Sequence, residues 1–345
     1  MGKLNDSILK EVVFPACGYQ RREVSVGPNF GVDASVIDMG GNRGLATSSD
    51  PLSLIPTLGL KESAWLSVHL TTNDMVTTGF APQYAQFVLN LPVSLEPEQF
   101  KTYWEYIHTF CKEIGVAITG GHTGRIEGQN SPMPGGCTMF LTAPHDRMVV
   151  SNRAEPGNVI VMTKETAISS SAILAKSFPE TVAGELGRER HQTACDNFYR
   201  TSVLAEGVAA AECLEPNKEL LAMHDATEGG ILGAVIEMAK ASGCGFVVDN
   251  GKIPANTVQK QICDLFGIDH RFSIGAGSMI MAVKKGKEEA LISHLDQRHI
   301  PAAAIGEFTA NPGEYKQLDD GHSSDVNFNG EDPYWQAFFK AMKLA

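Results

Sequence analysis

The sequence predicts a two-domain protein of the α/β (α+β) class. Its 345 residues exceed what one simple hydrophobic core usually contains, and two domains that share an interface are the default for this length. Segments with strand periodicity alternate with segments of helical periodicity along most of the chain. Near residue 150 a turn cluster, Arg153-Ala-Glu-Pro-Gly157, precedes a β-branched run. We therefore expect one domain over residues 1–150 and a second over residues 151–345.

The first half is predicted to form short strands and two helices. Strands are expected over residues 34–38, 45–49, 83–91, 116–119 and 137–143. Residues 62–78 have the length and periodicity of a helix, and a clearer helix is expected over residues 97–114. One face of this second helix is apolar and consists of Phe100, Tyr103, Trp104, Ile107, Phe110 and Cys111. Gly115 is a plausible stop for it.

The second half reads as a series of α/β units. A strand is expected over residues 159–163 and another over residues 220–223. Helices are expected over residues 166–178, 188–214 and 230–241. The tail after residue 311 is polar, and no pattern assigns it an element.

Composition narrows the class of partner and the compartment. A formal net charge of −12 argues against nucleic acid, whose phosphates need a basic face. No apolar run reaches the roughly 18 residues that a membrane span requires, and no signal peptide is visible. The seven cysteines show no CxxC spacing, which argues against disulfides and a zinc knuckle. We expect a cytoplasmic protein without a nucleic-acid or membrane partner.

Five acidic or glycine-rich sites lie where strands are expected to end or helices to begin. They are Gly31-Val-Asp33-Ala-Ser, Thr47-Ser-Ser-Asp50, Asn73-Asp74, Gly120-Gly-His-Thr123 and His224-Asp-Ala-Thr-Glu-Gly-Gly230. Each by itself is typical of a turn, because Asp side chains bond nearby backbone and glycine adopts unusual angles. Their order along the chain carries more information than any one of them.

Taken together, the five sites resemble the aminoimidazole ribonucleotide (AIR) synthetase-like superfamily. This superfamily includes AIR synthetase, selenophosphate synthetase, thiamine-monophosphate kinase and the hydrogenase-maturation carbamoyl dehydratase. The resemblance covers nearly the whole chain and looks nearest to the hydrogenase-maturation branch. It implies an N-terminal mixed sheet with helices that forms a β-barrel in a homodimer, and a C-terminal α/β sandwich. It also implies that ATP and Mg²⁺ are bound.

The resemblance assigns the residues of the five sites to roles. Asp33, Asp50 and Asp74 would hold Mg²⁺, which prefers oxygen ligands and bridges carboxylates to phosphates. Three converging carboxylates without a cation would repel one another. The nucleotide would contact Asn73, Gly120, Gly121, Thr123, Thr227, Glu228, Gly229 and Gly230. Glycines let a backbone approach phosphate, and a helix start favours anions. His122 and Asp225 are the candidate catalytic residues.

Two positions depart from the family pattern. Val32 replaces a carboxylate, and His122 stands where the family usually has an acidic residue. His122 could bond phosphate, carry a proton, provide a nitrogen ligand to a softer metal, or only fill the turn. The two departures are also compatible with a member that binds nucleotide without catalysis.

Other histidines and cysteines give weaker signals. His69, His108 and His224 have no ligand spacing such as HExxH, and we expect them to be structural. Cys17 lacks the neighbours of the reactive cysteine in selenophosphate synthetases and is expected to be an ordinary thiol.

The resemblance implies ATP-dependent phosphorylation, and so activation, of an oxygen in a small molecule or a peptide-borne group. The printed sequence ends at Ala345 and not in the cysteine that receives the carbamoyl group in the hydrogenase-maturation branch, so a different acceptor is expected. A small-molecule kinase like thiamine-monophosphate kinase and a non-catalytic nucleotide-binding assembly factor remain the alternatives.

Overall fold

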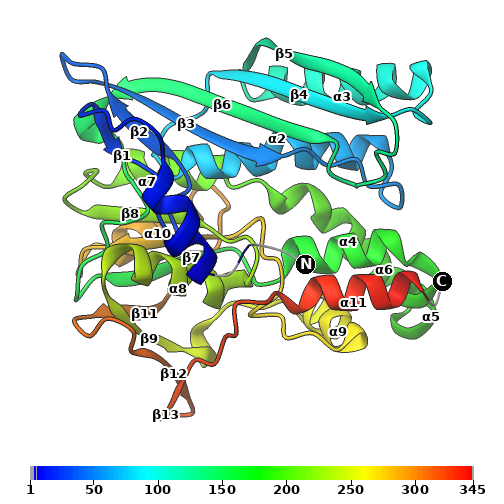
Figure 1. Cartoon of the computed structure of the whole chain (residues 1–345). Coiled ribbons are helices and arrows are strands. Elements are labelled where there is room, and N and C mark those ends of the chain that lie inside the picture. Colours follow the sequence, from blue (N-terminus) through cyan, green and yellow to red (C-terminus); the bar gives the residue numbers. More distant parts are fainter. Residues whose placement is uncertain (1–3, 5, 344–345) are drawn as a thin grey trace.

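Two mixed β-sheets form the frame of the chain, which a computed structural model describes at residue 4 and over residues 6–343 (Figure 1). The first half of the chain builds the upper sheet of Figure 1 and the second half the lower one. Helix α2 (Leu60–Val76) lies between them and contacts β3 (Arg43–Pro51) and β8 (Leu220–Asp225), one strand from each sheet. The predicted class is confirmed, while the boundary near residue 150 stays a prediction. The expectation of a different acceptor was drawn from the terminal Ala345, and this residue lies outside the described residues.

The first sheet has the strand order β1-β2-β3-β6-β4-β5. Among its described strand pairs only β4–β5 is parallel, so the sheet is mixed. The other elements of this half are α1 (Asp6–Ile8), η1 (Leu9–Val13), η2 (Phe14–Ala16), β1 (Val24–Val26), β2 (Ser35–Asp38), β4 (Tyr84–Pro92), α3 (Pro97–Glu113), β5 (Ala117–Ile126), β6 (Gly135–Pro144) and η3 (His145–Arg147).

Helices α2 and α3 cover one face of this sheet and leave the other face open. In β4, Ala85, Phe87 and Leu89 are buried in one cluster with side chains of both helices. Tyr84 and Val88, which alternate with them, are exposed. Successive side chains of a strand point to opposite faces, so the exposed residues mark the uncovered face.

The second sheet has the strand order β13-β12-β9-β11-β7-β10-β8. Its strands β7, β8 and β10 are buried along their whole length, whereas the edge strand β13 is exposed. The other elements of this half are β7 (Val159–Thr163), α4 (Ile168–Ser177), α5 (Pro179–Leu186), α6 (Arg188–Asp196), η4 (Asn197–Thr201), α7 (Leu204–Cys213), α8 (Gly230–Ser242), β9 (Gly245–Asp249), η5 (Asn250–Lys252), α9 (Thr257–Phe266), β10 (Met279–Val283), α10 (Glu288–Asp296), β11 (Ala302–Thr309), β12 (Tyr315–Asp319), β13 (His322–Asp325) and α11 (Pro333–Met342).

The single helix predicted over residues 188–214 is wrong, because the segment forms α6, η4 and α7. Two buried side chains bond the backbone at the break. The amine of Lys164 donates to the carbonyls of Arg200 and Ser202 at 2.9 and 2.7 Å. The amide of Asn73 donates to the carbonyl of Thr201 at 2.9 Å. Carbonyls engaged in this way are not used for a continuous helix.

The segment Gly120–Thr123 continues a strand, whereas a turn was predicted there. β5 runs through it and stays paired with β4 as far as Ile126. A Cβ atom at Gly121 would lie 1.8 Å from the carbonyl oxygen of Phe87, so the close strand pairing itself requires glycine at this position.

The polar tail folds back onto the second domain. Its strands β12 and β13 extend the second sheet, and α11 packs Tyr334 and Phe338 into a cluster with Phe178. Among the described residues, no helix has the length and apolar composition needed to cross a bilayer. All seven cysteines are free thiols in the structure.

His69 of α2 is a buried histidine in the core of the first domain. Its ring stacks on Trp65 with centroids 3.7 Å apart. Within the described part of the chain neither ring nitrogen has a hydrogen-bond partner. Burial lowers the pKa of His69 to about 3.

This environment predicts a pH dependence of stability. The folded-state pKa of His69 lies below the ordinary 6.5, so below that pH the unfolded chain takes up a proton that the folded protein does not. Between pH 7 and pH 5 this costs about 2 kcal/mol of unfolding free energy. Urea unfolding at both values should show that His69→Phe loses less stability than the parent. His108→Phe, at an exposed position of α3, is the control, and an equal loss in parent and His69→Phe would contradict the assignment.

Candidate functional site

Four aspartates from four separate elements meet at the junction of the two halves. Asp33 follows β1 in a loop, Asp50 lies near the end of β3, Asp74 is on α2, and Asp225 ends β8. Burial raises the pKa of Asp74 well above its ordinary range, and the charges of Asp225, Asp50 and Asp33 raise it further. The four carboxylates are therefore near enough to repel one another in a poorly solvated place.

Strand alternation explains how β3 contributes to this cluster. The side chain of Ser48 in β3 is buried on one face of the sheet. Asp50, two residues later in the strand, points to the same face. That face is the one covered by α2. The hydroxyl of Ser48 donates a hydrogen bond of 2.7 Å to Asp74 Oδ2. The end of β3 thus brings Asp50 to Asp74.

A close backbone contact brings the Asp33 loop to the second domain. Gly31 has a φ of 59°, and a Cβ atom there would lie 2.5 Å from the carbonyl oxygen of Glu237 on α8. Only glycine permits this approach. Asp33 then accepts a hydrogen bond of 2.9 Å from the hydroxyl of Ser151. The loop is anchored at both sides of Val32, which is partly buried against the first core.

His224 lies between two carboxylates of the cluster region. Its Nδ1 is 2.6 Å from Asp33 Oδ1, and its Nε2 is 3.0 Å from Glu237 Oε2. Burial by itself would lower the pKa of His224, but Asp33 and Glu237 outweigh it and hold the pKa well above the usual range. The sequence predicted a structural histidine and gave no signal of these partners, because residues 33 and 237 are distant in the chain.

The donor set fits a hard divalent cation. Ligand atoms of Asp33, His224 and Asp225 lie within 4.8 Å of one another. Carboxylates that raise one another's pKa either hold protons or bind a cation, and Mg²⁺ prefers oxygen ligands of this kind. Both nitrogens of His224 lie against carboxylates, so the oxygens of the aspartates are the groups suited to the metal.

Asn73 occupies a structural position beside the cluster. Its side chain is fully buried, donates to the carbonyl of Thr201 and accepts from the backbone N–H of Val203 at 2.9 Å each. It therefore joins α2 to the second domain. Its role in nucleotide binding stays a prediction.

The Gly229–Gly230 turn connects Asp225 to the start of α8 and is closely covered. A Cβ atom at Gly230 would lie 2.6 Å from the carbonyl oxygen of Arg271. The N–H of Gly229 donates to Asp332 Oδ2 at 2.7 Å, and Trp335 Nε1 donates to Glu228 Oε1 at 2.9 Å. The C-terminal segment thus contacts the predicted phosphate-binding turn. The roles of Thr227, Glu228, Gly229 and Gly230 in nucleotide binding stay predictions.

Gly120, Gly121, His122 and Thr123 lie apart from the aspartates within one chain. Asp50 on β3 pairs with Cys137 on β6. Phe87 on β4 pairs with both Cys137 and Gly121. Three strand spacings of about 4.8 Å separate Asp50 from Gly121 by roughly 14 Å.

His122 also points to the other side of the sheet. It pairs with Val88, which is exposed on the uncovered face, whereas Asp50 points to the face of α2. The structure therefore brings Asp33, Asp50, Asp74 and Asp225 together and does not bring His122 to them. The catalytic role of His122 stays a prediction, and within one chain His122 does not lie beside the aspartates.

Both halves of the chain match known protein domains. The N-terminal domain of AIR synthase related proteins matches residues 31–142, and their C-terminal domain matches residues 155–319. The two matches together span most of the chain. They confirm the resemblance that was drawn from the order of the five sites.

Individual relatives are about a quarter identical to this chain over the residues that align. A candidate hydrogenase expression/formation protein of Methanocaldococcus jannaschii is 25% identical over 230 residues, 67% of this chain and 64% of that protein. The selenide, water dikinase of Colwellia psychrerythraea is 25% identical over 313 residues, 83% of this chain and 85% of that enzyme. A crystal structure of the hydrogenase maturation protein HypE in complex with ATP aligns with a TM-score of 0.69 at 20% identity, over 88% of this chain and 89% of that one. The shared fold confirms the predicted two-domain architecture.

The repulsion at Asp74 gives a test of the cluster. Its folded-state pKa lies above the ordinary 3.8, so stability falls as the pH rises from that value towards the folded pKa. Asp74→Asn removes one charge and keeps the shape. In metal-free protein at pH 7 it should raise the Tm by about 2–4 °C.

Thermal unfolding in EDTA and then in Mg²⁺ measures this effect. The parent should gain stability from Mg²⁺ and the variant should gain less, because binding to the native state stabilises it. Asp296→Asn, at an exposed position of α10, is the control. A lower Tm of the Asp74→Asn variant than of the parent in EDTA would contradict the proposed repulsion among the four carboxylates.

Proposed function

Because the chain belongs to the AIR synthase related family, we propose that it is an ATP- and Mg²⁺-dependent enzyme that phosphorylates an oxygen of a small molecule or a peptide-borne group. The observation that carries the proposal is the meeting of Asp33, Asp50, Asp74 and Asp225 from both halves of the chain. Carboxylates that converge without a cation repel one another, which supports a metal-binding role for the set.

Each aspartate has a distinct part in this proposal. Asp33, Asp50 and Asp74 would hold Mg²⁺, which when bound neutralises charge on the transferred phosphoryl group. Asp225 comes from the second domain and would orient the acceptor oxygen or take its proton. His224 bonds Asp33 and Glu237 and so positions Asp33. Since the carboxylates come from both domains, the nucleotide would lie at their junction.

Comparisons with relatives support nucleotide use and leave the acceptor open. One similar structure is a HypE bound to ATP, and one similar enzyme is a selenide, water dikinase. These proteins act in different processes, so the family does not name the acceptor. A cytoplasmic location accords with the proposed use of ATP.

The metal set predicts the effect of a single replacement. Asp50→Asn should abolish Mg²⁺-dependent binding of a non-hydrolysable ATP analogue, because one charged ligand is lost where the phosphates and the metal meet. Isothermal titration with and without Mg²⁺ measures it. Asp38→Asn, at an exposed position of β2, is the control, and unchanged affinity of Asp50→Asn would remove Asp50 from the site.

An assay of ADP release separates enzyme from binding protein. We expect the parent protein to bind the ATP analogue and, when ATP and an acceptor are supplied, to release ADP. Binding without turnover over a broad set of metabolites and carrier peptides would favour the non-catalytic assembly factor. The outward direction of His122 is the observation that favours this second candidate.

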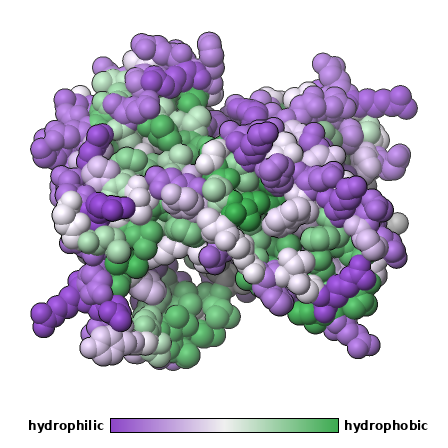
Figure 2. Space-filling view, turned by 90° about the horizontal axis from the view of Figure 1, so that it is seen from above, coloured by the Kyte–Doolittle hydropathy of each residue, from purple (hydrophilic) through white to green (hydrophobic). Residues whose placement is uncertain are grey.

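We propose further that two copies associate through the uncovered face of the first sheet. This face exposes Tyr84 and Val88, and Tyr84 stacks on Phe140 with centroids 5.3 Å apart. Figure 2 shows hydrophobic patches between hydrophilic residues on the side that carries this sheet. Exposed apolar patches mark association surfaces. His122, which lies beside Val88, would then be close to the partner.

A charge on this face should disrupt association. Val88→Lys is expected to convert a dimer into a monomer, because the amine would be buried without a partner. Light scattering coupled to size exclusion measures the mass. Val12→Lys, at an exposed position distant in sequence, is the control. A parent that is monomeric at micromolar concentration, or a Val88→Lys dimer, would contradict the proposal.

A further inference from the structure

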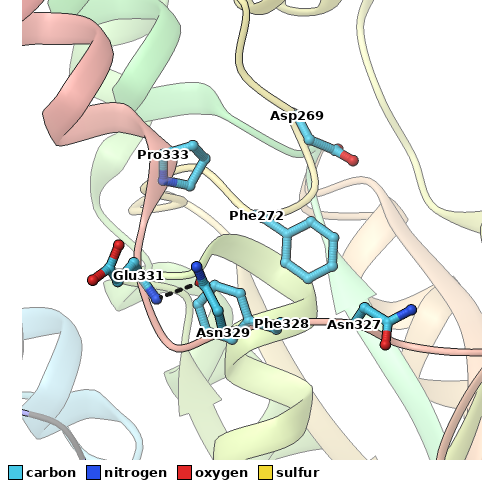
Figure 3. Close-up of a pocket in the computed structure, with 7 residues that line it drawn as sticks. All are labelled: Asp269, Phe272, Asn327, Phe328, Asn329, Glu331 and Pro333. Carbon is cyan, nitrogen blue, oxygen red and sulfur yellow. Dashed lines mark hydrogen bonds between the residues drawn. The ribbon is translucent and has the colours of Figure 1, made fainter.

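A segment near the C-terminus passes the start of α8. Residues 326–332 connect β13 to α11 and lie beyond the family match, which ends at residue 319. Figure 3 shows this segment running into α11, with Phe328 beside Phe272. A Cβ atom at Gly229 would lie 2.9 Å from the Phe328 ring, so the two are in close contact. Most residues of the segment are exposed, whereas Asp332 is buried and therefore needs partners.

Asp332 accepts one backbone N–H from each of two helix starts. Its Oδ2 accepts from Gly229 at 2.7 Å, and its Oδ1 accepts from Tyr334 at 2.8 Å. Burial raises the pKa of Asp332 to about 6, although both bonds act to lower it. Above this pH the group is a carboxylate with both oxygens engaged. Asp332 thus joins the start of α8 to the start of α11.

Two further N–H groups at the start of α8 are bonded within the chain. The N–H of Gly230 donates to the carbonyl of Thr227 at 3.1 Å. The N–H of Leu232 donates to the carbonyl of Arg271 at 3.2 Å. One carboxylate and two carbonyls thus take N–H groups that a helix start can otherwise offer to an anion.

The turn Thr227–Gly229 is fixed from two sides. On one side, the carbonyl of Thr227 accepts the N–H of Gly275 at 3.0 Å. On the other side, Trp335 Nε1 donates to Glu228 Oε1 at 2.9 Å, next to the bond between Gly229 and Asp332. Both contacts on this second side come from the C-terminal segment. The conformation of the turn therefore depends on residues outside the family match.

From these contacts we propose that Asp332 is a positioning residue, which fixes the turn Thr227–Gly229 at the nucleotide site in place of a bound anion. The inference rests on the proposed function, because Thr227 and Glu228 are predicted contacts of the nucleotide. A turn that is ordered before the ligand arrives avoids the entropic cost of ordering it on binding. Gly229 then contributes its conformation, with a φ of 82°, and its N–H serves Asp332.

Hydrogen exchange of the ligand-free protein tests whether Asp332 holds the turn. Asp332→Asn leaves one acceptor oxygen for two N–H groups, and Asp332→Ser keeps a single, shorter acceptor that suits the cap of α11. At pH 8, where the parent carboxyl is ionised, residues 226–232 should exchange about 10-fold faster or more in both variants. Glu331→Gln, an exposed carboxylate in the same segment, is the control. Unchanged exchange of residues 226–232 in both variants overturns the proposal.

Binding of a non-hydrolysable ATP analogue with Mg²⁺ separates positioning from competition. Isothermal titration should show that Asp332→Asn and Asp332→Ser weaken binding by about 5-fold or more, because the turn must then be ordered by the ligand. Glu331→Gln should keep the parental affinity. Tighter binding by the Asp332 variants would mean that Asp332 competes with a phosphate, and unchanged affinity would mean that the turn does not need it. Either result overturns the proposal.

A variant with a weakened α11 distinguishes positioning from a general loss of structure. Phe338 of α11 packs on Phe178 with ring centroids 5.4 Å apart. Phe338→Leu should lower the Tm, because buried contacts are lost, and it keeps the carboxylate that accepts from Gly229. Its affinity for the ATP analogue should therefore equal that of the parent. Weakening equal to that of Asp332→Asn would make the role of Asp332 structural only and overturn the proposal.

Failure of this inference and failure of the proposed function give different results. A parent that binds no ATP analogue contradicts the proposed function, and hydrogen exchange alone then decides whether Asp332 fixes the turn. A parent that binds the analogue, together with Asp332 variants that bind it equally well, contradicts the inference and leaves the proposed function standing.

Discussion

Repulsion among four converging carboxylates is the constraint on which the junction of the two domains depends. Asp33, Asp50, Asp74 and Asp225 arrive from a loop, a strand, a helix and a second strand. Their proximity opposes folding, as the raised pKa of Asp74 indicates. The surrounding packing must therefore hold them in place, and a bound cation would turn the repulsion into attraction. Under the proposed function, the site would gain metal binding at the expense of stability.

Polar contacts around the cluster show how the junction is held. Asn73 of α2 binds the backbone on either side of Ser202, and Lys164 binds two carbonyls of the same break in the helix. His224 links Asp33 to Glu237 across the two halves. These bonds involve buried groups, whose loss would leave unpaired partners. The residues beside the cluster thus hold the two halves of the chain together.

Local patterns predicted most elements, and tertiary contacts explain the exceptions. The strand at Val159–Thr163 agrees with its prediction, because a β-branched run bounded by turns needs no distant information. The helix predicted over residues 188–214 is interrupted because Lys164 and Asn73 bind its carbonyls from outside. The segment Gly120–Thr123 was expected to turn, but β4 pairs with it throughout. Glycine there reflects strand contact, which a sequence pattern alone does not distinguish from a phosphate loop.

The sequence by itself determined the α/β class and most helices and strands, because periodicity and turn chemistry are local properties of the chain. The set of four aspartates came from the order of the acidic sites and the family that this order resembles. Only the tertiary structure decided that His224 joins Asp33, that Asp332 covers the start of α8, and that His122 points away from Asp50. These relations join residues far apart in sequence. They depend on strand register and on the packing of two domains, which no local propensity specifies.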